Sequence, residues 1–314
     1  MKVFFVKLAF LALVLIVIPV ILILILNNNN TKDSKIISVY DESTKKIMKL
    51  NLEDYIINVV ASEMPASFSE EALKAQSVAA RTYAIRKVNK DAPEHNGADL
   101  CTNYAHCQAY SHKSVLKDNW GKNYSSNIAK IKKCVEATKG MYLSYNGSPA
   151  NCVFHSCSDG KTENAADVWG GAFSYLVSVD SPGDIEKKDF VTEVSVPCSE
   201  FLTKLKSEFE SFGDVTEVSI GDVTLSEGGN VNYITICNQS IKGTDIRRIF
   251  GLKSTAFTAV CNNSTVTFTV RGNGHGVGMS QYGANYMAKC GNNFSEILFH
   301  YYPGTKLETE YKLS

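Results

Sequence analysis

The chain has 314 residues, of which 44% are hydrophobic, and it carries 32 basic and 32 acidic side chains. This length accommodates one large domain or two lobes with ample hydrophobic core. The balanced charge argues against a nucleic-acid-binding protein, and the 21 glycines and 7 prolines argue against a fibrous or disordered chain.

The first residues have the composition of a membrane anchor. Lys2 and Lys7 precede an apolar run over residues 8–26, and a helix of that length nearly crosses a hydrocarbon core of about 30 Å. A cleaved signal peptide is the alternative, although its apolar core is usually shorter. We predict a protein of the cell membrane with a cytoplasmic N-terminus at 1–7, a transmembrane helix at 8–26, a polar stalk at 27–34 and an extracytoplasmic domain at 35–314.

The start of this domain has the pattern of a hairpin followed by a helix. Two β-rich runs flank the turn at residues 41–44. Asn51 can then cap a helix whose apolar residues recur at spacings of three and four. The helix should end at about Glu63, because Met64 precedes a proline and is therefore biased away from helical geometry.

A second helix is predicted over residues 69–90, where Ser67 and Glu70 have the spacing of a capping box. An irregular segment rich in Cys and His follows, and another helix is expected over residues 127–138.

Beyond Met141 the composition favours strands, which we expect at 141–145, 151–156, 190–196, 231–237 and 265–271, with helices at 202–212 and 280–289. Residues 183–262 are expected to form a self-contained αβ insertion lobe. The predicted fold class is α+β: a mixed helical and β-rich ectodomain with two lobes forming a groove, after one N-terminal transmembrane helix.

Glu63 is the sharpest candidate for a catalytic residue. It lies at the C-terminal end of a predicted helix, where the helix dipole opposes a carboxylate, and Met64, Pro65 and Phe68 surround it. These neighbours favour the protonated acid, which is the form that protonates a glycosidic bond. The alternative is an ordinary exposed glutamate at a helix end.

The segment 95–107 holds a candidate metal site. His95, Cys101, His106 and Cys107 supply imidazoles and thiols, which suit Zn²⁺, although their spacing is not that of a standard zinc finger. A disulfide between Cys101 and Cys107 is the alternative.

The other cysteines are expected to be mainly structural. The chain has nine, an odd number, so at least one is free, shared with another chain or bound to metal. Cys152 and Cys157 are expected to be core thiols. Buried thiols are also the expectation for Cys198, Cys237, Cys261 and Cys290.

A glycine-rich segment follows Arg271. Gly272, Gly274, Gly276 and Gly278 alternate, which predicts one bare strand face where a polymer or a neighbouring strand can lie close. His275 would point to the opposite face. Packing against bulky neighbours is the alternative. Further upstream, Trp169-Gly-Gly places an aromatic residue near small polar ones.

Several long motifs together resemble the stage II sporulation protein D family. They are Val60-Ala-Ser-Glu-Met-Pro-Ala-Ser-Phe68, Glu71-Ala-Leu-Lys-Ala-Gln-Ser-Val-Ala-Ala-Arg-Thr-Tyr83, Cys107-Gln-Ala-Tyr110, Arg247-Arg-Ile-Phe-Gly-Leu-Lys-Ser-Thr255 and His275-Gly-Val-Gly-Met-Ser-Gln-Tyr-Gly-Ala284. The resemblance covers about residues 36–310.

The resemblance implies a membrane-anchored lytic transglycosylase of endospore-forming bacteria that acts in engulfment of the forespore. Such an enzyme cleaves the bond between N-acetylmuramic acid and N-acetylglucosamine in denuded septal peptidoglycan and leaves a 1,6-anhydro end. The family's catalytic glutamate falls on Glu63. The implied partners are peptidoglycan glycan strands and the stage II sporulation proteins P, an amidase/endopeptidase, and M.

The resemblance also suggests which residues would line a glycan groove: Arg81, Tyr83, Gln108, Tyr110, His275, Gln281 and Tyr282. The first three zinc ligands would be His95, Cys101 and Cys107, with His106 or Glu63 as the fourth. Zinc on Glu63 would favour its ionised form and conflict with a general acid. Two other functions stay open: a zinc-dependent peptidoglycan amidase and a non-catalytic wall-binding amidase enhancer.

Overall fold

The computed structural model describes residues 18, 35–88, 90, 93–171 and 173–309. The predicted anchor and stalk therefore lie outside the described residues, apart from Ile18. Among the residues that are described, no helix combines the length and the apolar character needed to cross a membrane.

The predicted hairpin and first helix are confirmed. Strand β1 (Ile36–Asp41) pairs antiparallel with β2 (Lys46–Asn51), and β3 (Leu100–Cys101) adds to the other edge of β1 in parallel. Helix α3 (Leu52–Glu63) begins where the Asn51 side chain accepts the Glu53 N–H, and it ends because Met64 is extended, with φ −128° and ψ 135°.

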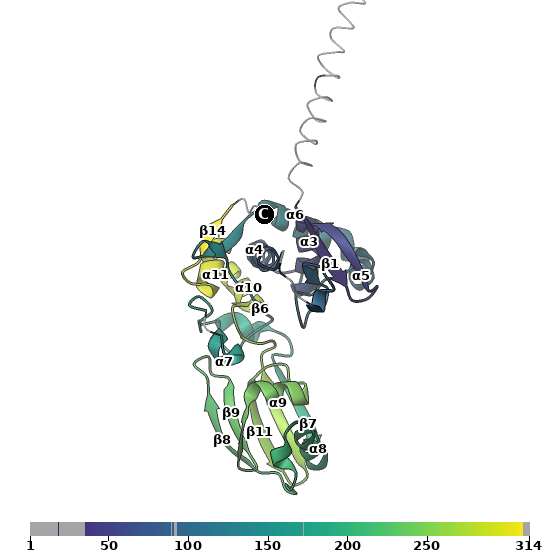
Figure 1. The fold of residues 1–314 in the computed structure, drawn as a ribbon. Helices are drawn as coiled ribbons and strands as arrows, with labels where there is room; N and C mark the ends of the chain where they lie inside the picture. Colours follow the sequence, from purple (N-terminus) through teal and green to yellow (C-terminus); the bar gives the residue numbers. More distant parts are fainter. Residues whose placement is uncertain (1–17, 19–34, 89, 91–92, 172, 310–314) are drawn as a thin grey trace, which may run out of the picture.

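The described residues form two hydrophobic cores, and we call the part built on the larger one the first body. Helix α4 (Glu70–Lys87) forms its centre, and most residues of this helix are buried. Around it pack α3, α6 (Tyr124–Ala137), α10 (Gln281–Lys289) and α11 (Phe294–Tyr301) (Figure 1). Its predicted capping box is wrong. Ser69 is the N-cap and makes no side-chain cap, while the Glu70 carboxylate is held by Lys133 Nζ at 2.7 Å.

Short strands complete this body. Strand β4 (Tyr142–Tyr145) lies between β14 (Lys306–Glu308) and β5 (Ser148–Pro149), and β6 (Phe154–His155) pairs in parallel with β13 (Met279–Ser280). The sequence pattern did not indicate helices α5 (Lys113–Trp120) and α11, and the strand expected at 151–156 is only β6. Short 3-10 turns lie at Pro93–His95, Gly121–Asn123, Pro182–Glu186 and Glu210–Phe212.

A second body, which we call the lobe, has its own hydrophobic core (Figure 1). One of its sheets has the strand order β11 (Ala256–Asn262), β12 (Thr265–Arg271), β7 (Val191–Pro197). The other has the order β10 (Gln239–Lys242), β9 (Val231–Ile236), β8 (Ile220–Leu225). Helices α8 (Cys198–Glu208) and α9 (Gly243–Phe250) belong to it. The expected insertion ended at residue 262, yet the middle strand β12 lies beyond that point, so the lobe extends to Arg271.

The glycine-rich segment after β12 is not the predicted strand. Gly272, Gly274, Gly276 and Gly278 have φ of 76°, 122°, 81° and 71°, a region that β-carbons disfavour. A Cβ on Gly278 would lie 2.2 Å from the Val153 carbonyl oxygen. These glycines therefore serve turns and close backbone approach and do not form one bare strand face.

The cysteines outside the candidate metal site are partly as expected. Cys152 and Cys157 are buried, which confirms them as core thiols. Cys198, Cys237 and Cys261 are only partly buried, and Cys290 is exposed. The expectation of burial fails for Cys290 because it follows α10 on the surface.

Candidate functional site

Three segments far apart in the chain meet at Glu63. The residue is the last of α3 and is half-buried. Its Oε1 accepts the backbone N–H of Ala109 at 2.6 Å, and its Oε2 lies 3.4 Å from the side-chain Nε2 of Gln281, the first residue of α10. The carboxyl group is thus fixed in position by two donors.

The surroundings of Glu63 favour its protonated form. Burial raises its pKa above the ordinary value of 4.5, and the hydrogen bonds from Ala109 and Gln281 offset part of this rise. Among the described residues Glu63 forms no ion pair that would stabilise the carboxylate. The carboxy-terminal end of α3 also disfavours negative charge. Such a group can donate a proton and afterwards accept one.

The candidate metal ligands lie together, and Cys107 is two residues before Ala109, whose N–H contacts Glu63. The donor atoms of His95, Cys101, His106 and Cys107 all lie within 4.8 Å of one another. His95 Nε2 is 3.2 Å from both His106 Nδ1 and Cys107 Sγ, and Cys101 Sγ is 3.5 Å from His106 Nδ1. Tetrahedral zinc with these donors requires spacings of about 3.3–3.8 Å, and these three pairs lie in or close to that range, so the donors suit that ion.

A metal ion binds the thiolate form of cysteine, so the state of the Cys101 and Cys107 thiols matters for this site. Cys101 and Cys107 are both free thiols, so the alternative disulfide is not formed. Burial raises the pKa of Cys107 to about 12, which means that its thiolate needs a cation beside it. Glu63 is not a member of the group. Its oxygens are directed at Ala109 and Gln281.

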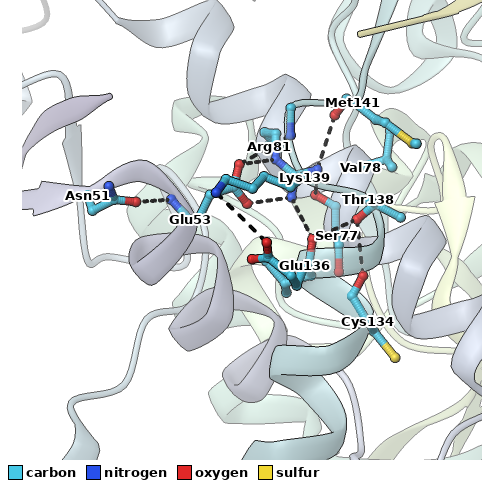
Figure 2. Close-up of polar contacts among 12 residues, drawn as sticks. Asn51, Glu53, Ser77, Val78, Arg81, Cys134, Glu136, Thr138, Lys139 and Met141 are labelled. Atoms are coloured by element: carbon cyan, nitrogen blue, oxygen red, sulfur yellow. Dashed lines mark hydrogen bonds and ion pairs between the residues drawn. The ribbon is translucent and has the colours of Figure 1, made fainter. Parts of the chain in front are cut away.

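Arg81 does not line a groove, contrary to the prediction. Its side chain is 1% exposed and its guanidinium is fully engaged inside the first body (Figure 2). Nε and one terminal nitrogen contact the two Glu53 oxygens at 2.9 and 2.6 Å, and the other terminal nitrogen donates to the Met141 carbonyl at 3.1 Å. Only the family resemblance placed Arg81 in the groove, because residues two apart in a helix, such as Arg81 and Tyr83, lie on different sides of it.

Tyr83 and Gln108 are also buried. The Tyr83 hydroxyl donates to the His106 carbonyl at 3.2 Å, and Gln108 Nε2 lies 3.4 Å from the Ala80 carbonyl. Both side chains therefore hold the Cys/His loop against α4. Tyr83 is 8% exposed and Gln108 is 2% exposed, which does not match the prediction that they contact glycan.

Of the other predicted groove residues, Tyr110 and Tyr282 are less buried, whereas Gln281 is as buried as Tyr83 and Gln108. Tyr110 stacks on Tyr55 with ring centroids 5.6 Å apart, and Tyr282 meets the Phe68 ring edge-on at 5.0 Å. Both are half-buried, whereas Gln281 is 5% exposed and reaches Glu63. His275 lies apart from Glu63 and contacts Trp169, with ring centroids 5.0 Å apart.

The Ala109 contact could not be predicted from the sequence. The donor is a backbone N–H, which every residue except proline offers, so no side-chain pattern could mark it. The sequence around Trp169 shows only an aromatic residue near small polar ones. The contact of Trp169 with His275 depends on the glycine turns that precede β13, the strand that pairs with β6.

Known proteins are similar to this chain over most of its length. A family model described as "Stage II sporulation protein" matches residues 40–145. The chain is 40% identical over 272 residues to Stage II sporulation protein D of Bacillus subtilis (strain 168), covering 86% of this chain and 78% of that protein. The same protein of Bacillus amyloliquefaciens is 39% identical over 279 residues, covering 88% and 80%. An amidase enhancer of Bacillus subtilis (strain 168) is 31% identical, but only 39% of it is covered.

Proposed function

The chain belongs to the stage II sporulation protein D family, and from this premise we propose that it is a peptidoglycan lytic transglycosylase of the engulfing membrane. Its substrate is the bond between N-acetylmuramic acid and N-acetylglucosamine in denuded septal glycan. The observation that carries the proposal is the half-buried Glu63 carboxyl group, whose burial raises its pKa and which has no cationic partner among the described residues.

Glu63 serves both halves of the reaction. The protonated carboxyl group donates its proton to the glycosidic oxygen as the bond to C1 of the muramyl sugar breaks. The resulting carboxylate then takes the proton from the muramyl C6 hydroxyl, whose oxygen bonds to C1 and closes the 1,6-anhydro ring. The substrate supplies the nucleophile, so no second carboxylate is required, in contrast to most glycoside hydrolases.

Neighbouring groups hold Glu63 for this task. The Ala109 N–H on Oε1 fixes the orientation of the carboxyl group, and the Gln281 amide can stabilise the carboxylate once the first proton has left. Burial raises the pKa of Glu63 and these two donors lower it. Such a balance suits a carboxyl group that first gives a proton and then receives one.

Zinc belongs to the proposal as a structural ion. His95, Cys101, His106 and Cys107 would hold it and complete a tetrahedral shell, so the ion would cross-link the loop behind Glu63. A closed shell leaves no position for water, and this disfavours the zinc-dependent amidase. We also propose that the N-terminal segment anchors the protein and that the partners are the sporulation proteins P and M.

An amidase enhancer is the second candidate, because one relative carries that name. In that case the protein would bind the wall without cutting it, and Glu63 would be dispensable.

The experiment that separates these functions is mass spectrometry of the products from denuded glycan incubated with the full chain in mild detergent. Wild type should release 1,6-anhydro-muramyl ends, and Glu63→Gln should release none while still sedimenting with the glycan. Glu70→Gln removes a surface carboxylate of α4 and should leave cleavage unchanged. Reducing ends would indicate a hydrolase, released stem peptides an amidase, and an active Glu63→Gln protein would remove Glu63 from the mechanism.

A further inference from the structure

A pocket of about 320 Å³ lies at the junction of the two bodies. Helix α7 (Ala165–Trp169) provides one wall with Asp167, Trp169 and Gly170, and the lobe provides the other with Asn232, Tyr233 and Lys242. Figure 1 shows α7 between the first body and strands β8 and β9 of the lobe. None of these residues takes part in the site around Glu63.

Two aromatic side chains of this pocket are exposed to solvent. Trp169 is 49% exposed and Tyr233 is 38% exposed, on opposite walls. Exposed aromatic rings that flank a hollow mark binding sites more often than chance positions. Beside Trp169, Gly170 has φ +76° and no atom within 4 Å of where a Cβ would be, so the space above the backbone is open. Exposed aromatic faces suit a ring-shaped ligand with an apolar face, such as a sugar.

The polar groups of the pocket indicate what that ring carries. Lys242 is exposed and forms no ion pair with any residue that the structure describes. Asn232 supplies an amide that can donate and accept hydrogen bonds. Asp167 also lines the pocket, and its carboxylate can accept hydrogen bonds from sugar hydroxyls. Aromatic faces, an amide, a carboxylate and an ammonium without an ion pair together suit an N-acetylated sugar whose own carboxylate binds at Lys242.

Contacts connect this pocket to Glu63. The side chain of Gln281 contacts the Glu63 carboxyl group, and the residue before it, Ser280, ends strand β13. In the pairing of β13 with β6, Ser280 lies opposite His155. The His155 ring lies 5.7 Å from the His275 ring, which in turn lies 5.0 Å from Trp169. Ser280 and His155 are 0% and 4% exposed, so this chain of contacts links the pocket to Glu63 through the interior of the protein.

We propose that the junction pocket is a distal glycan subsite, in which Trp169 and Tyr233 stack on a sugar ring and Lys242 binds the free lactyl carboxylate of a muramic acid unit. This inference rests on the glycan substrate proposed above and extends it to the chemistry of a unit remote from the cleaved bond. It implies that long strands bind better than short ones and that removal of the stem peptide exposes the carboxylate that Lys242 recognises.

The chain offers a direct probe, because it contains two tryptophans and only Trp169 lines the pocket. Trp120→Phe leaves Trp169 as the single reporter, and Glu63→Gln prevents cleavage. We would titrate this double variant of the full chain with glycan oligosaccharides of two to eight sugars and follow tryptophan emission and acrylamide quenching. Long oligosaccharides should shift the emission to the blue and protect Trp169, and disaccharides should not.

Variants then test each wall. Trp169→Ala and Tyr233→Ala should each weaken binding of long oligosaccharides about tenfold and leave disaccharide binding unchanged. Lys242→Met should weaken binding of muramic-acid glycans but not of chitooligosaccharides, which carry no carboxylate. Lys204→Met, on α8 of the same lobe, is the matched control and should change neither.

The outcomes separate this inference from the proposed activity. If wild type releases anhydro products while no oligosaccharide perturbs Trp169, the subsite is wrong and the activity stands. If wild type cleaves nothing while long glycans still protect Trp169, the subsite stands and the activity is wrong. Equal effects of Lys242→Met on muramic-acid glycans and chitooligosaccharides would overturn the assignment of the carboxylate.

Discussion

Glu63 shows how a single carboxyl group acquires acid character from its position. It is the last residue of a helix, it is half-buried, and its two donors are a backbone N–H and a neutral amide. Neither donor carries a charge, so desolvation and the helix dipole outweigh them and the pKa rises. The same environment means that the ionised form destabilises the fold.

Replacement of Glu63 should therefore stabilise the protein in a pH-dependent way. The folded state binds the Glu63 proton more tightly than the unfolded state, so wild type loses stability as pH rises from 4.5 through the raised pKa. Glu63→Gln has no proton to lose. Its melting temperature should match that of wild type at acid pH and exceed it at pH 8. An advantage that shrinks as pH rises would contradict the raised pKa.

At the scale of elements, Arg81 connects helix α3, which ends at Glu63, to the elements packed against it. Its guanidinium links Glu53 in the first turn of α3 to the Met141 carbonyl that precedes β4 (Figure 2). A third contact, 3.4 Å from the Val135 carbonyl, lies near the end of α6. A planar fork with several donors suits this position better than an ammonium group does.

Arg81→Met should lower stability by about 3 kcal/mol, because Glu53 and the carbonyls lose a buried cationic partner. Chemical denaturation measures the loss, and Arg81→Lys should recover only part of it. Cleavage per folded molecule should be unchanged, since Arg81 does not reach the glycan. A selective loss of glycan affinity with normal stability would restore Arg81 to the groove.

The glycine segment that follows β12 is a second element with a demanding geometry. Gly278→Ala places a Cβ against the Val153 carbonyl oxygen at φ +71°, and it should cost about 3 kcal/mol in unfolding free energy. Gly291→Ala also has a positive φ, +96°, but meets no atom within 4 Å, so it should cost about 1 kcal/mol. Equal costs in denaturant titrations would mean that the close approach to Val153 is unimportant.

At the scale of the whole molecule, two hydrophobic cores form two bodies, and the proposed chemistry uses both. Glu63 and the Cys/His cluster belong to the first body, whereas Tyr233 and Lys242 of the junction pocket belong to the lobe. Strand β12 leads directly into the glycine segment that carries His275 and continues to Gln281. The lobe is thus connected to the site by the chain that also positions a donor to Glu63.

Zinc should stabilise the first body without taking part in cleavage. We expect one zinc per chain by elemental analysis, and chelation should lower the melting temperature by about 5 °C or more while the anhydro products per folded molecule stay the same. Cys101→Ser should lose the metal, and Cys290→Ser, an exposed thiol outside the cluster, should keep it. Rapid loss of cleavage at an unchanged melting temperature would instead place zinc in the reaction.

The sequence by itself determined the features that depend on local chemistry. The hairpin follows from two β-rich runs around a turn, and it is confirmed. The helix ending at Glu63 follows from capping by Asn51 and from the proline after Met64, and it is confirmed as well. The Cys/His loop could be recognised because its four side chains lie within a short segment. Long motifs also sufficed to recognise the family that the comparisons confirm.

Only the tertiary structure decided which of the candidate residues face one another. Arg81 and Tyr83 lie on one helix, and periodicity cannot show that α6 and the segment before β4 cover the first of them. Alternating glycines resemble a strand until their positive φ angles are known. The Ala109 N–H, the Gln281 amide and the pocket between α7 and the lobe arise from contacts between distant segments. Such contacts are fixed by the packing of whole elements, which no local pattern of residues records.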